Sequence, residues 1–261
     1  MSKKSLPHVI TCMNVAAGVL ACIFGISGSY TTALYCIFAA AVFDFFDGLV
    51  ARLLRVNSPF GKELDSLADV VSFGLAPALA LYQLLKSQFP DIGGFSFLFF
   101  IPVLAVPVCS AVRLAKFNID ERQGTSFIGL PVPAHAVMWS PFICAVGGTY
   151  LPAGLVPINF QSIPDFVLFA MLTVLPVLTA LLMVSELPMF SLKVKSKADR
   201  ETKFIIYLAV ATVVLLVLFG VAGISLAVVF YILLCYYEDV FFYVIDGFYE
   251  YGKDSELLAN E

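Results

Sequence analysis

The sequence predicts an all-α membrane protein, a polytopic bundle of about eight transmembrane helices with both termini in the cytoplasm. Of the 261 residues, 61% are hydrophobic and only 13% are charged, whereas soluble domains have about 45–50% apolar and about 25% charged residues. The apolar residues form runs of about 20, the helix length that crosses a bilayer core. Lysine and arginine gather in alternate connections between these runs. This composition excludes a disordered chain, a collagen-like fibre and a basic nucleic-acid-binding module.

Eight apolar segments define the expected helices, and the connections between them are rich in glycine and proline, which is typical of turns. In chain order the segments are approximately residues 9–27, 31–54, 64–85, 95–115, 131–148, 166–185, 203–220 and 223–240. They make one transmembrane domain over residues 1–240. In the remaining tail, 241–261, aromatic residues alternate with acidic ones. Such a tail is expected to lie in the cytoplasm or at the membrane interface.

The distribution of basic residues predicts the orientation. If the N-terminus is cytoplasmic, every lysine and arginine except Lys86 falls in a cytoplasmic section, as the positive-inside rule requires. An odd number of helices would break this pattern halfway along the chain. The sequence therefore predicts a multi-pass protein of the cell membrane.

The acidic residues of the first third of the chain are confined to the ends of the second and third segments. Before Lys86 they are Asp44, Asp47, Glu63, Asp65 and Asp69. Helical spacing puts several motif residues on one face of the second segment; they are Asp44, Asp47, Gly48, Ala51 and Arg52. Gly61, Asp65 and Asp69 recur every four residues on the third. A helical hairpin turning at 53–60 would bring the two faces together near the cytoplasmic interface.

Four converging aspartates indicate a site for divalent metal. Carboxylate oxygens suit hard cations such as Mg²⁺, Mn²⁺ or Ca²⁺, and one or two ions would relieve the mutual repulsion of the carboxylates. Gly48 leaves room for a ligand, and Arg52 has the planar donors that suit phosphate. We therefore expect a metal-assisted phosphate or pyrophosphate site, open to the cytoplasm and within reach of a lipid. Two alternatives are helix caps paired with nearby basic residues, and an ion pathway, which usually places its carboxylates near the bilayer midplane.

These residues resemble the signature of a known family. The pattern Asp44-x2-Asp47-Gly48-x2-Ala51-Arg52-x8-Gly61-x3-Asp65-x3-Asp69 is similar to that of the CDP-alcohol phosphotransferases. RLAKFN at 113–118, FIGLPVPA at 127–134 and LPHVITCMN at 6–14 resemble its membrane-embedded (type II) phosphatidylserine synthase branch. The chain departs from that branch at His8, where Asn is common, and at His135, where a small residue is common.

The resemblance implies transfer of the phosphatidyl group from CDP-diacylglycerol to L-serine with release of CMP. It implies two Mg²⁺ or Mn²⁺ ions held by four aspartates, Asp44, Asp47, Asp65 and Asp69. Asp69 would also accept the proton of the serine hydroxyl. The residues expected to contact CDP are Thr11, Gly48, Arg52, Ser58 and Gly61. A homodimer is implied as well.

Serine needs a cation for its carboxylate. Arg113, Lys116 and Arg122 belong to the next cytoplasmic section, and Arg113 is preferred because it ends the fourth segment and can point into the bundle. Asn118 is the second expected serine contact, and His135 is expected to pack or cap. The alternatives are a family member that uses glycerol 3-phosphate or an inositol phosphate, which would require a denser basic cluster, and an ion-coupled transporter.

Overall fold

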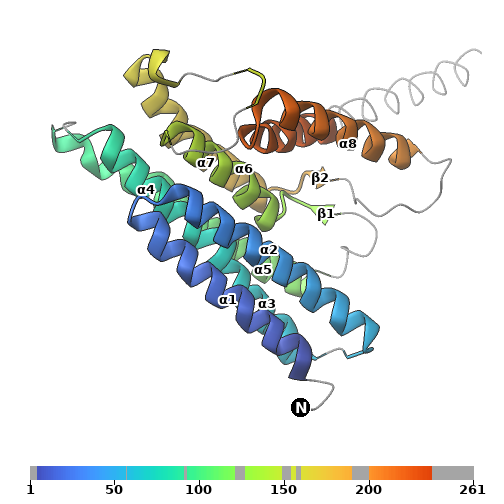
Figure 1. Ribbon diagram of the computed structural model, residues 1–261. Coiled ribbons are helices and arrows are strands. Elements are labelled where there is room, and N and C mark those ends of the chain that lie inside the picture. The colour runs from blue at the N-terminus through green and yellow to red at the C-terminus, as the bar shows by residue number, and fades with distance from the viewer. Residues whose placement is uncertain are drawn as a thin grey trace, which may run out of the picture.

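The computed structural model describes residues 5–56, 58–90, 93–120, 127–148, 154–156, 160–189 and 200–236. Helices α1 (Ser5–Ile26) and α2 (Tyr30–Leu53) pack side by side and are joined by a tight turn (Figure 1). Helix α3 (Pro59–Asp69), the π-helical turn η1 (Val70–Leu75) and α4 (Ala76–Gln88) form one continuous helical rod over residues 59–88. Helix α5 (Phe100–Ile119) follows the 3-10 turn η2 (Gly93–Phe99).

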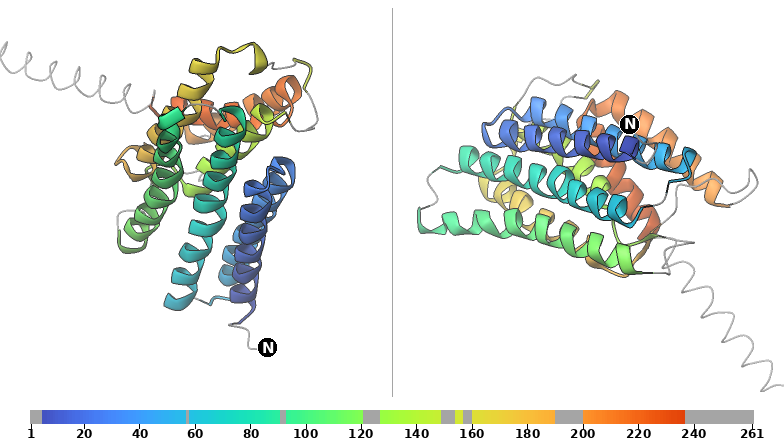
Figure 2. Two further views of the ribbon diagram at one scale, coloured as in Figure 1. Left: turned by 90° about the vertical axis from the view of Figure 1, so that its left-hand side faces the viewer. Right: turned by 90° about the horizontal axis from the view of Figure 1, so that it is seen from below.

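The second half of the chain packs against part of this group. It contains α6 (Val132–Val146), α7 (Asp165–Val184), α8 (Arg200–Phe219) and a last helix, Ala222–Tyr236. Figure 2 shows α1 with α2, the α3–α4 rod, and α5 as three successive layers, and α8 runs at an angle to them. The expected tail, 241–261, lies outside the described residues.

The described helices agree with the eight expected segments, and five of them are long and apolar enough to cross a membrane. Those five are Ser5–Ile26, Tyr30–Leu53, Pro59–Gln88, Ser96–Ile119 and Asp165–Val184. The apolar parts of the other three are shorter, namely Val132–Val146, Ile205–Phe219 and Ala222–Tyr236. The chain therefore forms a membrane-type helical bundle with five long candidate spans.

The third helix begins earlier than expected, at residue 59 instead of 64. Pro59 stands in its first turn, and the Ser58 side chain accepts a hydrogen bond from the Gly61 backbone N–H at 3.3 Å. Both features are typical of helix starts. The polar residues of this first turn resemble a loop in composition, which is why the hydropathy pattern missed it.

A short strand pair departs from the expected all-helical structure. Strand β1 (Phe127–Ile128) pairs antiparallel with β2 (Pro188–Met189), so that the segment before α6 is tied to the segment after α7. Gly129 follows β1 with φ +73°, and its N–H donates to the Leu187 carbonyl at 2.9 Å. Two-residue strands carry too little alternation to be recognised in a sequence.

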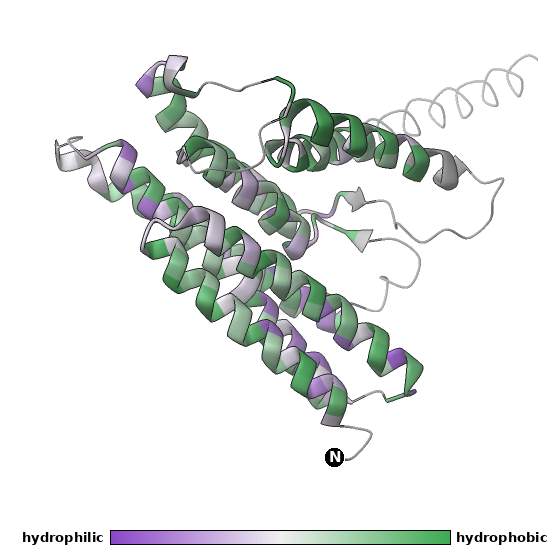
Figure 3. Ribbon diagram, in the orientation of Figure 1, coloured by the Kyte–Doolittle hydropathy of each residue, from purple (hydrophilic) through white to green (hydrophobic). Residues whose placement is uncertain are grey.

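Polar side chains gather at one end of the bundle. Figure 3 shows hydrophobic residues along most of the helices, which fits contact with lipid, and several hydrophilic residues along α3 and near the end of α2, besides those at the opposite helix ends. The start of α1 lies at the same end (Figure 1). We call this the α2–α3 end of the bundle.

Candidate functional site

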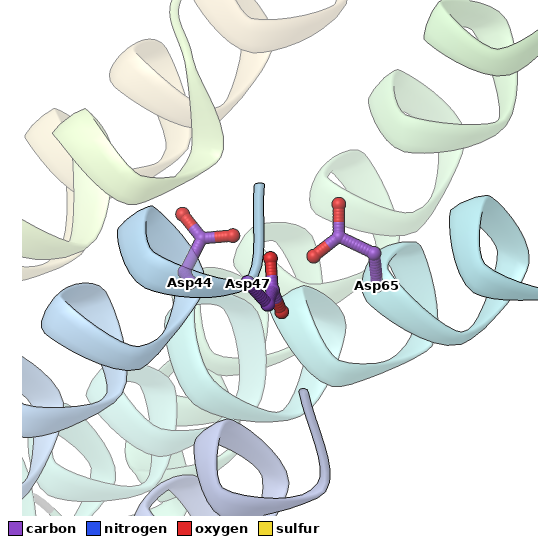
Figure 4. A group of neighbouring side chains, drawn as sticks. All are labelled: Asp44, Asp47 and Asp65. Carbon is purple, nitrogen blue, oxygen red and sulfur yellow. The ribbon is translucent and has the colours of Figure 1, made fainter. Parts of the chain in front are cut away.

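Three carboxyl groups meet at the α2–α3 end. Asp44 and Asp47 come from α2 and Asp65 comes from α3, and each offers an oxygen atom within 4.8 Å of the others. Figure 4 shows the three groups gathered between the two helices. Asp47 is buried, and Asp44 and Asp65 are half-buried. The hairpin expected from the spacing of the aspartates is therefore present.

This donor set fits a divalent cation. Asp47 Oδ2 and Asp65 Oδ1 are buried, and neither has a hydrogen-bond partner among the described residues. Buried carboxylate oxygens without partners are costly, and neighbouring like charges add to that cost. A cation removes both costs, and an all-oxygen set suits Mg²⁺, Mn²⁺ or Ca²⁺.

Asp69 lies one turn further along α3, outside the group of three. Its carboxylate is buried and interacts electrostatically with those of Asp44, Asp65 and Asp47. The Asn14 side chain of α1 donates a hydrogen bond to Asp69 Oδ1 at 3.3 Å. Its expected role as a metal ligand and proton acceptor stays a prediction.

A cavity of about 650 Å³ opens beside the carboxylates. It is lined by residues of α1, α2, α3 and the connection between the last two, namely Pro7, His8, Thr11, Asp47, Gly48, Ala51, Val56, Ser58, Pro59, Gly61, Lys62 and Asp65. Four of the five expected CDP contacts, Thr11, Gly48, Ser58 and Gly61, are in this lining; Arg52 is exposed and is not. The volume falls within the range of small-molecule sites.

The two motif glycines have different surroundings. A Cβ atom built on Gly48 would have no atom within 4 Å, so this glycine keeps a space open. A Cβ on Gly61 would lie 3.0 Å from His8 Nε2. The His8 ring also packs edge-on against Phe60, with the ring centroids 5.3 Å apart. Gly61 therefore allows the start of α1 to pack closely against α3.

The hydroxyl groups at the cavity are oriented by helix starts. Ser58 Oγ accepts the cap hydrogen bond from Gly61 N, which leaves its O–H able to donate to an anionic ligand. The Thr11 O–H donates to the Pro7 carbonyl at 3.1 Å. The cavity thus combines a carboxylate end that suits a metal with a donor that suits a phosphate.

The two expected serine contacts differ in their surroundings. Arg113 is buried on α5, where its guanidinium lies over the Phe117 ring at 5.1 Å and interacts electrostatically with Asp69. Asn118 joins α5 to α3, because its amide donates to Ser66 Oγ at 3.0 Å and to Glu63 Oε1 at 3.4 Å. Arg113 thus interacts with one of the aspartates, whereas the hydrogen bonds of the Asn118 amide go to residues on either side of Asp65, and serine binding by either residue stays a prediction.

Other residues weighed from the sequence lie elsewhere. His135 is buried in α6 and forms a hydrogen bond with Thr179 of α7 at 3.1 Å, which agrees with packing. Lys116 Nζ donates to the Val184 carbonyl at 3.4 Å, and Arg122 lies outside the described residues.

Sequence reasoning missed Asn14. This residue is fully buried, and its side chain donates a hydrogen bond to Asp69, which lies 55 positions further along the chain. One signal was available, because Asn14 is a single amide within a long apolar run, three residues after Thr11 and four before Gly18. Polar groups inside apolar membrane helices are rare and commonly functional.

The family comparison agrees with this geometry. The sequence model of the CDP-alcohol phosphatidyltransferase family matches residues 4–160, which hold every residue of the site described above. The match ends before α7, so the expected extent of the domain, 1–240, stays a prediction.

Curated relatives are similar over the same region. A CDP-diacylglycerol–serine O-phosphatidyltransferase of Mycobacterium leprae is 40% identical over 139 residues, 51% of this chain and 44% of the relative. The enzyme of that name from Bacillus subtilis is 34% identical over 149 residues, covering 54% and 81%. An archaetidylserine synthase of Methanothermobacter thermautotrophicus is 35% identical over 140 residues, covering 53% and 57%. The matched region spans about half the length of the mycobacterial and archaeal relatives. With the family match and the carboxylate geometry, these relatives show that the chain belongs to the CDP-alcohol phosphatidyltransferase family.

Proposed function

We propose that this protein is a phosphatidylserine synthase, which transfers the phosphatidyl group of CDP-diacylglycerol to L-serine and releases CMP. The observation that carries the proposal is the group of three carboxylates whose oxygens lie within 4.8 Å of one another, beside a cavity that Gly48 keeps open. The names of the relatives support serine as the acceptor.

The aspartates provide the metal site of the proposed reaction. Asp44, Asp47 and Asp65, with Asp69 beside them, would hold one or two Mg²⁺ or Mn²⁺ ions. When bound, such ions polarise the phosphate and neutralise charge on the departing CMP. The partnerless oxygens of Asp47 and Asp65 support this assignment.

The cavity would bind the CDP headgroup. The Ser58 hydroxyl lines the cavity and would donate to phosphate, and the open side of Gly48 would let the ligand approach α2. Arg52, which is exposed outside the lining, would have to turn toward the ligand to add its donors. The lipid chains would remain between the helices, in the membrane. One relative is named for an archaetidyl product. An assay that compares CDP-diacylglycerol with its archaeal-type counterpart would identify the lipid chains that this protein uses.

Proton transfer would fall to Asp69. The serine hydroxyl is a weak nucleophile until a base takes its proton. In the proposed step, the serine oxygen bonds to the phosphorus that carries diacylglycerol, the bond from that phosphorus to the CMP oxygen breaks, and the hydroxyl proton passes to Asp69. Arg113, buried beside Asp69, would bind the serine carboxylate and thereby place the hydroxyl.

The proposed setting is the cell membrane, crossed several times, with the site facing the cytoplasm. Support comes from the five long apolar helices and from the position of the basic residues. In this proposal the protein also forms the homodimer that the resemblance implies.

An acceptor assay tests the function. Purified protein in detergent receives CDP-diacylglycerol, Mn²⁺ or Mg²⁺, and one of three alcohols: L-serine, glycerol 3-phosphate or an inositol phosphate. Of the three alcohols, we expect only L-serine to give CMP release. The release should stop when the metal is chelated and return when metal is added again. The isosteric variant Asp65→Asn is expected to be inactive. Ser140→Ala should match the wild type, because it removes a buried hydroxyl whose hydrogen bond, among the described residues, is to the Ala136 carbonyl of the same helix.

Two outcomes would count against the proposal. CMP release with a phosphorylated alcohol and none with serine would overturn the assignment of the acceptor. No CMP release with any alcohol, from protein that is folded and binds Mn²⁺, would overturn the assignment as a phosphotransferase.

A further inference from the structure

We propose that Asn14 of α1 is a positioning residue that orients the Asp69 carboxylate to accept the proton of the alcohol. The inference rests on the proposed function, because it gives Asp69 the role of base. Its starting point is the hydrogen bond from Asn14 Nδ2 to Asp69 Oδ1 at 3.3 Å, between two buried side chains.

The contact leaves one carboxylate oxygen for chemistry. Within the described ranges, Asn14 is the residue whose side chain donates to Asp69, and it occupies Oδ1. A carboxylate held at one oxygen has a restricted plane, so Oδ2 keeps a defined direction. Catalytic groups need this kind of support, because a displacement of about 1 Å can lower a rate about 100-fold.

The backbone of α1 around Asn14 packs closely against η1. The Ser72 hydroxyl of η1 donates to the Asn14 backbone carbonyl at 3.1 Å. One turn along α1, a Cβ on Gly18 would lie 2.8 Å from Ser72 Cα, so the two helices are in close backbone contact. The π-helical turn begins directly after Asp69, and such turns occur frequently at functional sites. These contacts set the packing of the α1 backbone against the rod, and the side-chain amide is oriented by its own hydrogen bond to Asp69.

The other end of the amide argues against a purely structural role. Asn14 Oδ1 is buried and has no partner among the described residues. An unpartnered buried acceptor destabilises a fold, and side chains retained for packing alone avoid it. The amide therefore orients Asp69 while its unpartnered oxygen lowers the stability of the fold, a combination that is common at active sites.

The test compares Asn14→Leu and Asn14→Asp with Ser72→Ala. Leucine has a similar volume and no donor, and aspartate keeps the shape but puts a second carboxylate beside Asp69. Ser72→Ala is the matched control, because it removes the hydrogen bond from η1 to the α1 backbone without touching the amide. Asp69→Asn sets the lowest expected rate.

We expect both Asn14 variants to lose about 10- to 100-fold in kcat. KM for CDP-diacylglycerol should stay within about threefold of wild type in both, and Mn²⁺ affinity should do so in Asn14→Leu. Asn14→Leu should melt no lower than Ser72→Ala, and Ser72→Ala should keep kcat within about twofold of wild type. If the leucine variant does not fold, the isosteric aspartate variant gives the comparison. Mn²⁺ affinity is measured by titration calorimetry.

Three results would overturn the inference. These are wild-type kcat in the Asn14 variants, an equal loss of kcat in Ser72→Ala, and a loss of Mn²⁺ affinity that matches the loss of kcat. Failure of the proposed function is seen separately, in the wild type before any variant is made. If the wild type uses another alcohol, the same comparison is run with that alcohol.

Discussion

Gly48 and Gly61 belong to one motif, yet the space around them differs. An added Cβ would meet nothing within 4 Å at Gly48 and would lie 3.0 Å from His8 Nε2 at Gly61. The family resemblance treats the two glycines alike, since it implies that both contact CDP. The structure separates a glycine that leaves room for a ligand from one that lets two helices approach.

This difference predicts unequal effects of alanine. Gly48→Ala should raise the stability of α2 by about 0.5–1 kcal/mol, because alanine favours helix, while the new methyl group weakens CDP-diacylglycerol binding. Gly61→Ala should be less stable than Gly48→Ala, because its methyl group has to displace the His8 ring, and His8→Ser should remove the difference. Thermal melting and KM for CDP-diacylglycerol measure both effects. A Gly48→Ala protein that melts earlier but binds normally would contradict this prediction.

The sequence predicted that the aspartates of α2 and α3 meet, but it did not predict the hydrogen bonds that Asn14 and Asn118 form. Asp44, Asp47 and Asp65 follow a helical spacing that places them on facing helices, and the structure confirms that they meet. The hydrogen bonds of Asn118 to α3 and of Asn14 to Asp69 join positions more than 50 residues apart. Without the tertiary structure, nothing in the local pattern of either residue identifies its partner.

At the scale of elements, apolar runs located the helices but not their irregularities. The start of α3 was missed because a capped first turn is polar. The π-helical turn was also missed, since Val70–Leu75 has the composition of an ordinary buried helix. The strand pair β1–β2 depends on tertiary contact between segments 60 residues apart, which no local pattern contains.

Gly129 is expected to be essential to the stability of that strand pair. Its φ is +73°, and an added Cβ would lie 2.9 Å from the Ser185 carbonyl oxygen, with the Met183 carbonyl oxygen also in contact. Gly129→Ala should therefore lower stability by about 1–3 kcal/mol. Gly94→Ala, where an added Cβ meets nothing within 4 Å, is the matched control and should change stability by less than about 0.5 kcal/mol. Thermal melting in detergent compares them, and equal melting temperatures would contradict the argument.

At the scale of the whole molecule, the rod 59–88 separates Lys86 from the α2–α3 end. Its 30 residues are long enough to cross a bilayer. The length and hydropathy of a segment do not give the angle between its helix and the neighbouring helices. The angled course of α8 in Figure 2 therefore could not be predicted. The basic residues still predict which end of the rod faces the cytoplasm.

Thiol labelling tests this orientation. In intact cells a membrane-impermeant maleimide should label Lys86→Cys strongly and should label Arg55→Cys only after permeabilisation, because the two exposed positions lie at opposite ends of the rod. Labelling of the six native cysteines in the wild type is subtracted. The reverse pattern would invert the proposed topology, and equal labelling in intact cells would contradict a rod that crosses the membrane.

The π-helical turn has a further consequence for how this chain can change over evolutionary time. Each residue of an α-helix turns the chain by about 100°, so losing or gaining one residue within 70–75 would rotate α4 relative to Asp69. The outer half of the rod would then present a different face to its neighbours, while every side chain kept its identity. We therefore expect natural selection to act more strongly against single-residue deletions and insertions between Asp69 and Ala76 than against most substitutions there.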